Sequence, residues 1–146
     1  MATVFSYPAT GYVPEPLVNF NSFEERKRLS PSSLTVFFNM MKAWKVRDDD
    51  AKLLLGGVSN GPFYGMKKNP QDKVLDIDQM FRISYLLGIF KALNILHGQS
   101  LADEWVRLPN SNVLFGGKAA LEYMLAGGLP AMQNVRRLLD GRRGGV

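Results

Sequence analysis

Three groups of residues in this 146-residue chain have types that could do chemistry, but each lacks a partner or the necessary geometry. Residues 48–50 are consecutive aspartates, and because neighbouring residues of a helix point in different directions, they cannot converge on one metal ion. The Gly-Gly-Lys of residues 116–118 is similar to a phosphate loop, but Asn112 and Ala119 stand where that loop needs glycine and serine or threonine. His97 is the only histidine and there is no cysteine, which excludes a transition-metal cage. We therefore expect no enzyme activity, no metal and no cofactor.

The segment from residue 48 to residue 68 has the outline of a helix-turn-helix. A short apolar helix ends at Gly56 and Gly57, and Ser59 suits the cap of a second helix. This second helix, residues 59–66, would be the recognition helix of a DNA-binding protein. The outline is equally compatible with a scaffold or a dimer surface that binds no DNA.

The side chains of this second helix predict weak reading of base sequence. Its first turn holds Gly61, Pro62 and Phe63, none of which can hydrogen-bond to a base edge. Base contacts are expected from Asn60 and Tyr64, and phosphate contacts from Arg47, Lys67 and Lys68. Any binding to operator DNA should therefore depend mainly on phosphate contacts.

The net charge of +5 is concentrated at the C-terminal end. Residues 107–146 contain six basic and two acidic side chains, and four of the six are Arg136, Arg137, Arg142 and Arg143. On charge alone such a tail attracts nucleic acid or an acidic pocket equally well. A solvated tail that only aids solubility is the third interpretation.

Apolar residues recur at helical spacing through most of the chain, and no convincing strand is present. Ser22 opens a short helix with a capping box, and Ser30 with Pro31 indicates a stronger helix start. Asp76 caps a helix that reaches about His97, and this helix is apolar nearly all round, as expected for a central element. Further helices are expected before the glycines at 127–128 and from there to Gly141, which should end the last one. The fold class predicted is all-α.

These elements divide into three parts. Residues 1–21 are rich in proline and aromatic residues and predict an extended arm. Residues 22–75 form the helix-turn-helix unit, and residues 76–146 form a second helical domain with a C-terminal tail. The chain has no cysteine, no apolar run of about 18 residues and no signal-peptide pattern, so we expect a cytoplasmic protein without a membrane contact.

The second domain resembles the toxin-binding domain shared by the MbcA/ParS/Xre antitoxin family. The resemblance rests on an ordered series of residues: Arg82, Leu86 and Ile89 in one helix; Ala102 and Trp105 before Pro109 and Asn110; Phe115 and Gly116 in a turn; Val135 and Leu138 before a glycine-rich end. We expect Trp105 to be part of the core and Asn110 to cap a turn.

The resemblance implies an all-helical antitoxin, typically dimeric, with an Xre-like N-terminal half. The partner it implies is a RES-domain toxin that degrades NAD, with the antitoxin's C-terminal segment reaching into the toxin's active site. The residues expected to bind the toxin are Arg137, Arg142, Arg143, Gly144, Gly145 and Val146. Glycines let a backbone approach a pocket closely, arginines can bind carboxylates at its rim, and the Val146 carboxylate suits a pocket for a phosphorylated substrate. The rival hypothesis is a helix-turn-helix transcription regulator without a toxin partner.

Overall fold

The computed structural model describes the backbone of residues 18–144 and the side chains of residues 18–142. Six α-helices and two single turns of 3-10 helix follow one another: α1 (Phe23–Ala43), α2 (Asp48–Leu54), α3 (Asn60–Lys68), η1 (Pro70–Asp72), α4 (Ile77–Leu96), α5 (Gln99–Trp105), η2 (Val113–Phe115) and α6 (Ala120–Gly144). The described part of the chain has no strand, only a single bridge between Pro109 and Ala119. The all-α prediction is thus confirmed, while most of the predicted N-terminal arm, residues 1–17, lies outside the described residues.

Helix α1 begins where the sequence predicts, at the Ser22 cap, whose hydroxyl accepts a bond from the Glu25 amide. The second start predicted at Ser30 is wrong, because α1 continues through Pro31 to Ala43. Ser30 is fully buried inside the helix. Its hydroxyl donates to the Arg26 carbonyl at 2.5 Å and accepts from the Leu75 amide at 2.8 Å. Ser30 therefore ties the segment before α4 to α1 instead of starting a helix.

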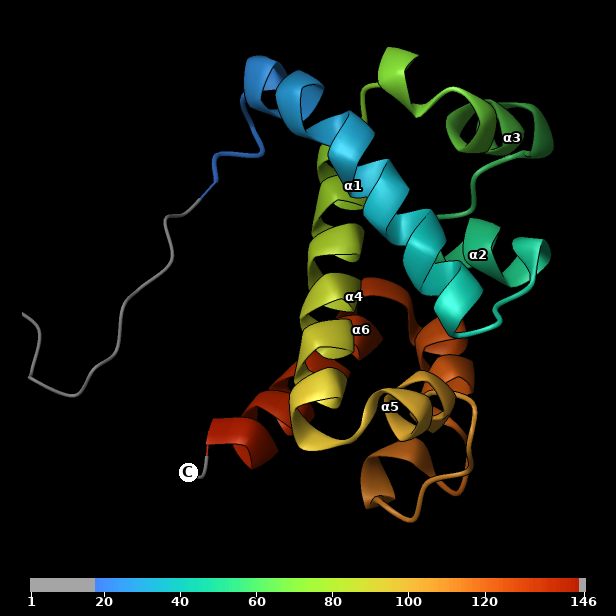
Figure 1. The fold of residues 1–146 in the computed structure, drawn as a ribbon, viewed down its shortest axis with the longest axis vertical. Coiled ribbons are helices and arrows are strands. Elements are labelled where there is room, and N and C mark those ends of the chain that lie inside the picture. The colour runs from blue at the N-terminus through green and yellow to red at the C-terminus, as the bar shows by residue number, and fades with distance from the viewer. Residues whose placement is uncertain (1–17, 145–146) are drawn as a thin grey trace, which may run out of the picture.

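Helix α4 is the central element, and α1, α5 and α6 all pack against it (Figure 1). Its start is fixed by a reciprocal capping box in which the side chains of Asp76 and Gln79 bond each other's backbone amides. Its buried residues, among them Ile83, Ile89 and Ala92, cover a wide arc of the helix, as the apolar pattern predicts. One hydrophobic core runs from Leu34 in α1 to Leu139 in α6. This core includes residues from both sides of residue 75, and the division into two domains there stays a prediction.

Helix α6 contains a sharp kink at Gly128, which has φ 64° and ψ −143°. The two helices predicted on either side of residues 127–128 are the two arms of this kink. The end predicted at Gly141 is wrong, because α6 remains helical to Gly144. Gly141 is exposed with open space around it, and an ion pair of 2.8 Å between Arg136 and Asp140 spans the preceding turn. A glycine weakens such a helix by only about 0.5–1 kcal/mol, so it need not terminate one.

Two of the glycines of α6, Gly128 and Gly141, should respond to alanine substitution in opposite ways. Gly128→Ala places a side chain in a backbone conformation reserved for glycine, and we expect a loss of unfolding free energy of about 1–3 kcal/mol. Gly141→Ala, the matched control, should stabilise by up to about 1 kcal/mol, because the helix there has room for a methyl group. Urea unfolding measures both. Equal stability of the two variants would show that the kink imposes no strain.

Candidate functional site

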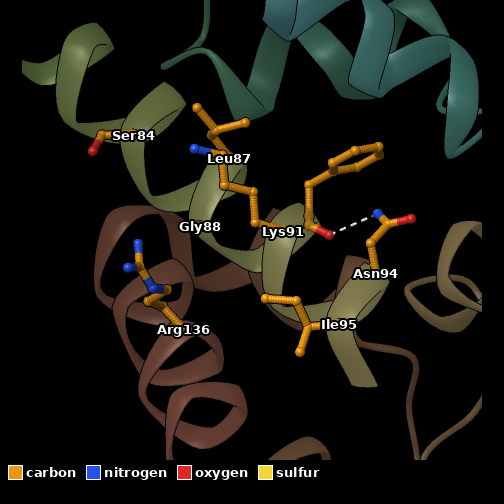
Figure 2. A pocket seen from close by; sticks show the side chains of 8 residues that line it. Ser84, Leu87, Gly88, Lys91, Asn94, Ile95 and Arg136 are labelled. Atoms are coloured by element: carbon orange, nitrogen blue, oxygen red, sulfur yellow. Dashed lines mark hydrogen bonds between the residues drawn. The ribbon is translucent and has the colours of Figure 1, made fainter. Parts of the chain in front are cut away.

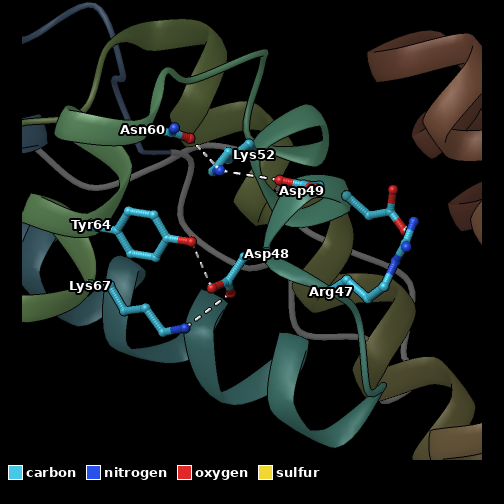
Figure 3. A network of polar contacts seen from close by, with 8 residues as sticks. Arg47, Asp48, Asp49, Lys52, Asn60, Tyr64 and Lys67 are labelled. Carbon is cyan, nitrogen blue, oxygen red and sulfur yellow. Dashed lines mark hydrogen bonds and ion pairs between the residues drawn. The ribbon is translucent and has the colours of Figure 1, made fainter.

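Charged residues at the start of α2 form a network with α3 (Figure 3). The Asp48 carboxylate accepts bonds from the Tyr64 hydroxyl at 3.1 Å and from the Lys67 ammonium at 3.0 Å. Lys52 donates to Asp49 at 3.2 Å and also to the Asn60 side chain. The network joins residues that are 8 to 19 positions apart in the sequence, so it holds α3 against α2.

Of the five residues predicted to contact DNA, four lie in or beside this network. Asn60, Tyr64 and Lys67 bond to α2 side chains, and Arg47 forms an ion pair of 3.5 Å with Asp50. Lys68 is exposed, and no ion pair joins it to any residue the structure describes. The surface thus brings the predicted residues together, but acidic groups of α2 neutralise much of their charge.

This pairing lowers the pKa of the Asp48 carboxyl. The hydrogen bond from Lys67 lowers the pKa of Asp48, slight desolvation opposes this effect, and the bond from Tyr64 adds to it. A lowered pKa means that the interaction contributes stability at neutral pH and loses it as the pH falls through the pKa of the folded state. Because both charges are partly exposed, the contribution is about 0.2–1 kcal/mol.

We expect any DNA binding by this surface to be dimeric, salt-sensitive and dependent on Arg47, Lys67 and Lys68. Removing Lys67 and Lys68 by alanine substitution should weaken binding and reduce the salt slope by about one per lost phosphate contact. Asp48→Asn should have the opposite effect, because it removes a charge that repels phosphate and releases Lys67. Titrations at two salt concentrations measure this, with the exposed Lys27→Ala as control. Affinity that does not respond to salt or to these substitutions would refute the phosphate-contact hypothesis.

Arg82 is the first of the residues on which the family resemblance rests, and in the structure it holds three helices together. Its Nε donates to Asp78 at 2.7 Å and its Nη1 to the Leu54 carbonyl at 3.4 Å, and its guanidinium lies beside Gly128. It therefore connects the end of α2, the first turns of α4 and the kink of α6. Nothing in this placement makes it a contact for a partner.

The segment between α5 and α6 is held by aromatic packing. The rings of Trp105 and Phe115 meet edge to face at 6.0 Å, and Phe115 meets Tyr123 of α6 in the same way at 5.5 Å. Trp105 is 8% exposed, which confirms the prediction that it belongs to the core. Asn110 caps a turn as predicted, since its side chain accepts from the Asn112 amide at 2.9 Å.

The C-terminal end of α6 carries the predicted toxin-binding residues. Leu139 is the last buried residue among the side chains that the structure describes, and beyond it α6 continues away from α4 (Figure 1). Arg137 donates to the Asn134 side chain at 3.1 Å, and Arg142 is exposed on the helix. The backbone at 143 and 144 is helical, while the predicted contacts Gly145 and Val146 lie outside the described residues.

A groove on α4 is a feature that the sequence analysis did not find. Arg136 of α6 lies so close to Gly88 that a side-chain carbon at this glycine would overlap the guanidinium group. Next to this contact, Ser84, Lys91 and Asn94 line a hollow of about 400 Å³ (Figure 2). The signal in the sequence that could have indicated this contact was Gly88, a glycine in the middle of a long apolar helix.

The structural features define an all-helical protein in which α6 extends past the core residue Leu139. Within residues 18–144, no group of acidic or histidine side chains could hold a metal ion. In the same range, no helix is long and apolar enough to cross a membrane.

The comparisons with known proteins give the family. Residues 92–145 match the model of the antitoxin Xre/MbcA/ParS C-terminal toxin-binding domain. The chain is also 38% identical to the uncharacterized protein y4oB of Sinorhizobium fredii (strain NBRC 101917 / NGR234), over 116 residues that are 79% of this chain and 87% of that protein. A search of solved structures found no match. The chain belongs to the Xre/MbcA/ParS antitoxin family, and its toxin-binding domain supports a role as an antitoxin in a toxin-antitoxin system.

Proposed function

We propose that this antitoxin neutralises a RES-domain toxin that degrades NAD, and that its C-terminal tail blocks the toxin's active site. The observation that carries the proposal is the toxin-binding domain at residues 92–145, which includes the end of α4, α5, the following turn and all of α6. The RES class of the toxin is implied by the family resemblance.

The shape of α6 supports a blocking role for the tail. The helix is anchored by Met132, Val135 and Leu139, all completely buried, and it continues beyond the body to Gly144. A segment presented on an anchored helix loses less conformational entropy on binding than a free chain would. Its arginines can form two parallel hydrogen bonds with carboxylates, which favours an acidic rim around the toxin's pocket.

The test is an enzyme assay with a RES-domain protein encoded beside this gene. Purified toxin should consume NAD, and the equimolar antitoxin should stop the consumption and elute with the toxin in size-exclusion chromatography. If the two proteins form no complex, the toxin is of another class or absent. A complex with full NAD consumption would show binding without neutralisation.

Autoregulation through operator DNA and assembly as a homodimer in the cytoplasm are further parts of the proposal. The support for DNA binding is the order of helix, glycine turn and helix in α2 and α3, where Gly56 and Gly57 both have positive φ. The rival role, a transcription regulator without a toxin, predicts strong operator binding and no partner at the neighbouring locus. The Asp48 carboxylate pairs with both Tyr64 and Lys67 and competes with DNA phosphates for them, which weighs against strong operator binding.

A further inference from the structure

The guanidinium of Arg136 lies against the backbone of α4 at one position, Gly88 (Figure 2). Gly88 is buried, and a side-chain carbon there would overlap the guanidinium. The arginine therefore fills the gap that the glycine leaves in the side-chain surface of α4. Because every other residue type has this carbon, only glycine allows the contact.

Arg136 is also fixed from its own helix. Its Nε donates to the Asp140 carboxylate one turn later, at 2.8 Å. The Arg136 side chain nevertheless stays 34% exposed, and it lines the hollow of about 400 Å³ on α4. An arginine has five N–H donors, so the bond to Asp140 leaves it capacity to bind a second anion.

Lys91 brings a second positive charge to the same hollow. It follows Gly88 by three residues, which places both on one face of α4 with a helical rise of only about 4.5 Å between them. Lys91 is exposed, and no ion pair joins it to any residue that the structure describes. Its flexible four-carbon side chain can therefore bring the ammonium to an anion that Arg136 binds.

The rest of the lining is partly polar and partly apolar. The Ser84 hydroxyl is exposed beside the two cations, and the Asn94 amide nitrogen is already used in a bond of 2.9 Å to the Phe90 carbonyl. Leu87 and Ile95 form an apolar wall, and Ile95 is 62% exposed. Such a lining fits a negative charge that has an apolar group next to it, whereas a DNA phosphate would leave the wall uncovered.

We propose that this hollow binds an acidic side chain of the toxin. The carboxylate lies between Arg136 and Lys91, and an apolar neighbour of the acidic residue packs on Ile95. Arginine suits this role because its planar group binds both oxygens of a carboxylate. The proposal rests on the proposed function, because it requires a toxin that binds this chain.

The position of the hollow supports the toxin as the source of the carboxylate. Asn94, Ile95 and Arg136 belong to residues 92–145, the part of the chain that matches the toxin-binding domain. The helical rise from Arg136 to Arg142, where the proposed blocking tail begins, is about 9 Å. A toxin that receives the tail therefore has its surface close to the hollow.

Two substitutions test the site by the affinity for the purified toxin of the neighbouring gene, measured by isothermal titration calorimetry. Lys91→Glu turns an attraction into a repulsion and should raise the Kd by about tenfold or more. Gly88→Ala keeps every charge but displaces the Arg136 guanidinium, so it should raise the Kd severalfold. Lys27→Glu, which reverses an exposed charge on α1, is the matched control and should bind like the wild type.

The melting temperatures of the free variants should stay close to that of the wild type, because Lys91 is exposed and Gly88→Ala moves only the end of a flexible side chain. A wild type that forms no complex would contradict the proposed function itself. A complex that either Lys91→Glu or Gly88→Ala forms as tightly as the wild type would overturn this inference alone. An equal loss of affinity in Lys27→Glu would also overturn it, because the effect would then come from net charge.

Two further measurements identify another occupant. A phosphate-induced rise in the melting temperature of the free wild type, lost in Lys91→Glu while toxin affinity is unchanged, would assign the hollow to a free anion. A lower mass of free Lys91→Glu in light scattering would assign it to a second copy of this chain. Either result would overturn the proposal.

Discussion

Deletion of residues 142–146 should abolish inhibition of the toxin while the antitoxin stays folded and bound. The deletion removes the end of α6 beyond Leu139, the last buried residue that the structure describes, so every described core side chain is kept. The remaining helical surface of the antitoxin can still bind the toxin, so the complex should form. The active site loses the segment proposed to fill it, so NAD consumption in the presence of the truncated protein should approach that of free toxin.

The deletion is best paired with variants that separate charge from length. Arg142→Ala with Arg143→Ala keeps the backbone of the tail but removes its positive charge. Lys27→Ala with Lys42→Ala removes two exposed charges from α1 and should inhibit like the wild type. Thermal unfolding and binding are measured for each form beside the NAD assay. Full inhibition by the truncated protein would show that neutralisation comes from another surface.

Replacement of Trp105 by alanine should destabilise the fold by about 3–5 kcal/mol. Trp105 is almost fully buried, and its ring links α5 through Phe115 to Tyr123 of α6. Total stabilities of natural domains are about 5–15 kcal/mol, so this loss would leave much of the protein unfolded at physiological temperature. Toxin binding should fall as a consequence of unfolding.

Leu101→Ala is the matched control in the same helix. Leu101 is 47% exposed, so its truncation should change the unfolding free energy by no more than about 0.5 kcal/mol. Denaturant unfolding and toxin binding of the two variants are compared. A Trp105→Ala protein that melts like the wild type but fails to bind toxin would instead make Trp105 an interface residue.

Sequence patterns located most of the helices correctly because the signals that start helices are local. Asp76 and Gln79 are three residues apart, and their capping box forms as the spacing predicts. The failures arose where a local signal competed with packing. Ser30 and Pro31 have the types of a helix start, but burial of Ser30 and its bond to Leu75, 45 residues away, keep them inside α1.

The sequence by itself therefore determined the fold class, the central position of α4, the burial of Trp105 and the family. These follow from helical periodicity, short-range capping and an ordered series of residue types, all properties of neighbouring positions. Only the tertiary structure decided that Asp48 binds Tyr64 and Lys67, that Arg136 lies against Gly88, and that α6 continues past Gly141. These three contacts join residues 16 to 48 positions apart, and the free energy of such pairing depends on how the helices pack. The end of α6 depends on the turns before it, where burial of Leu139 and the Arg136–Asp140 ion pair stabilise the helix enough to continue past Gly141.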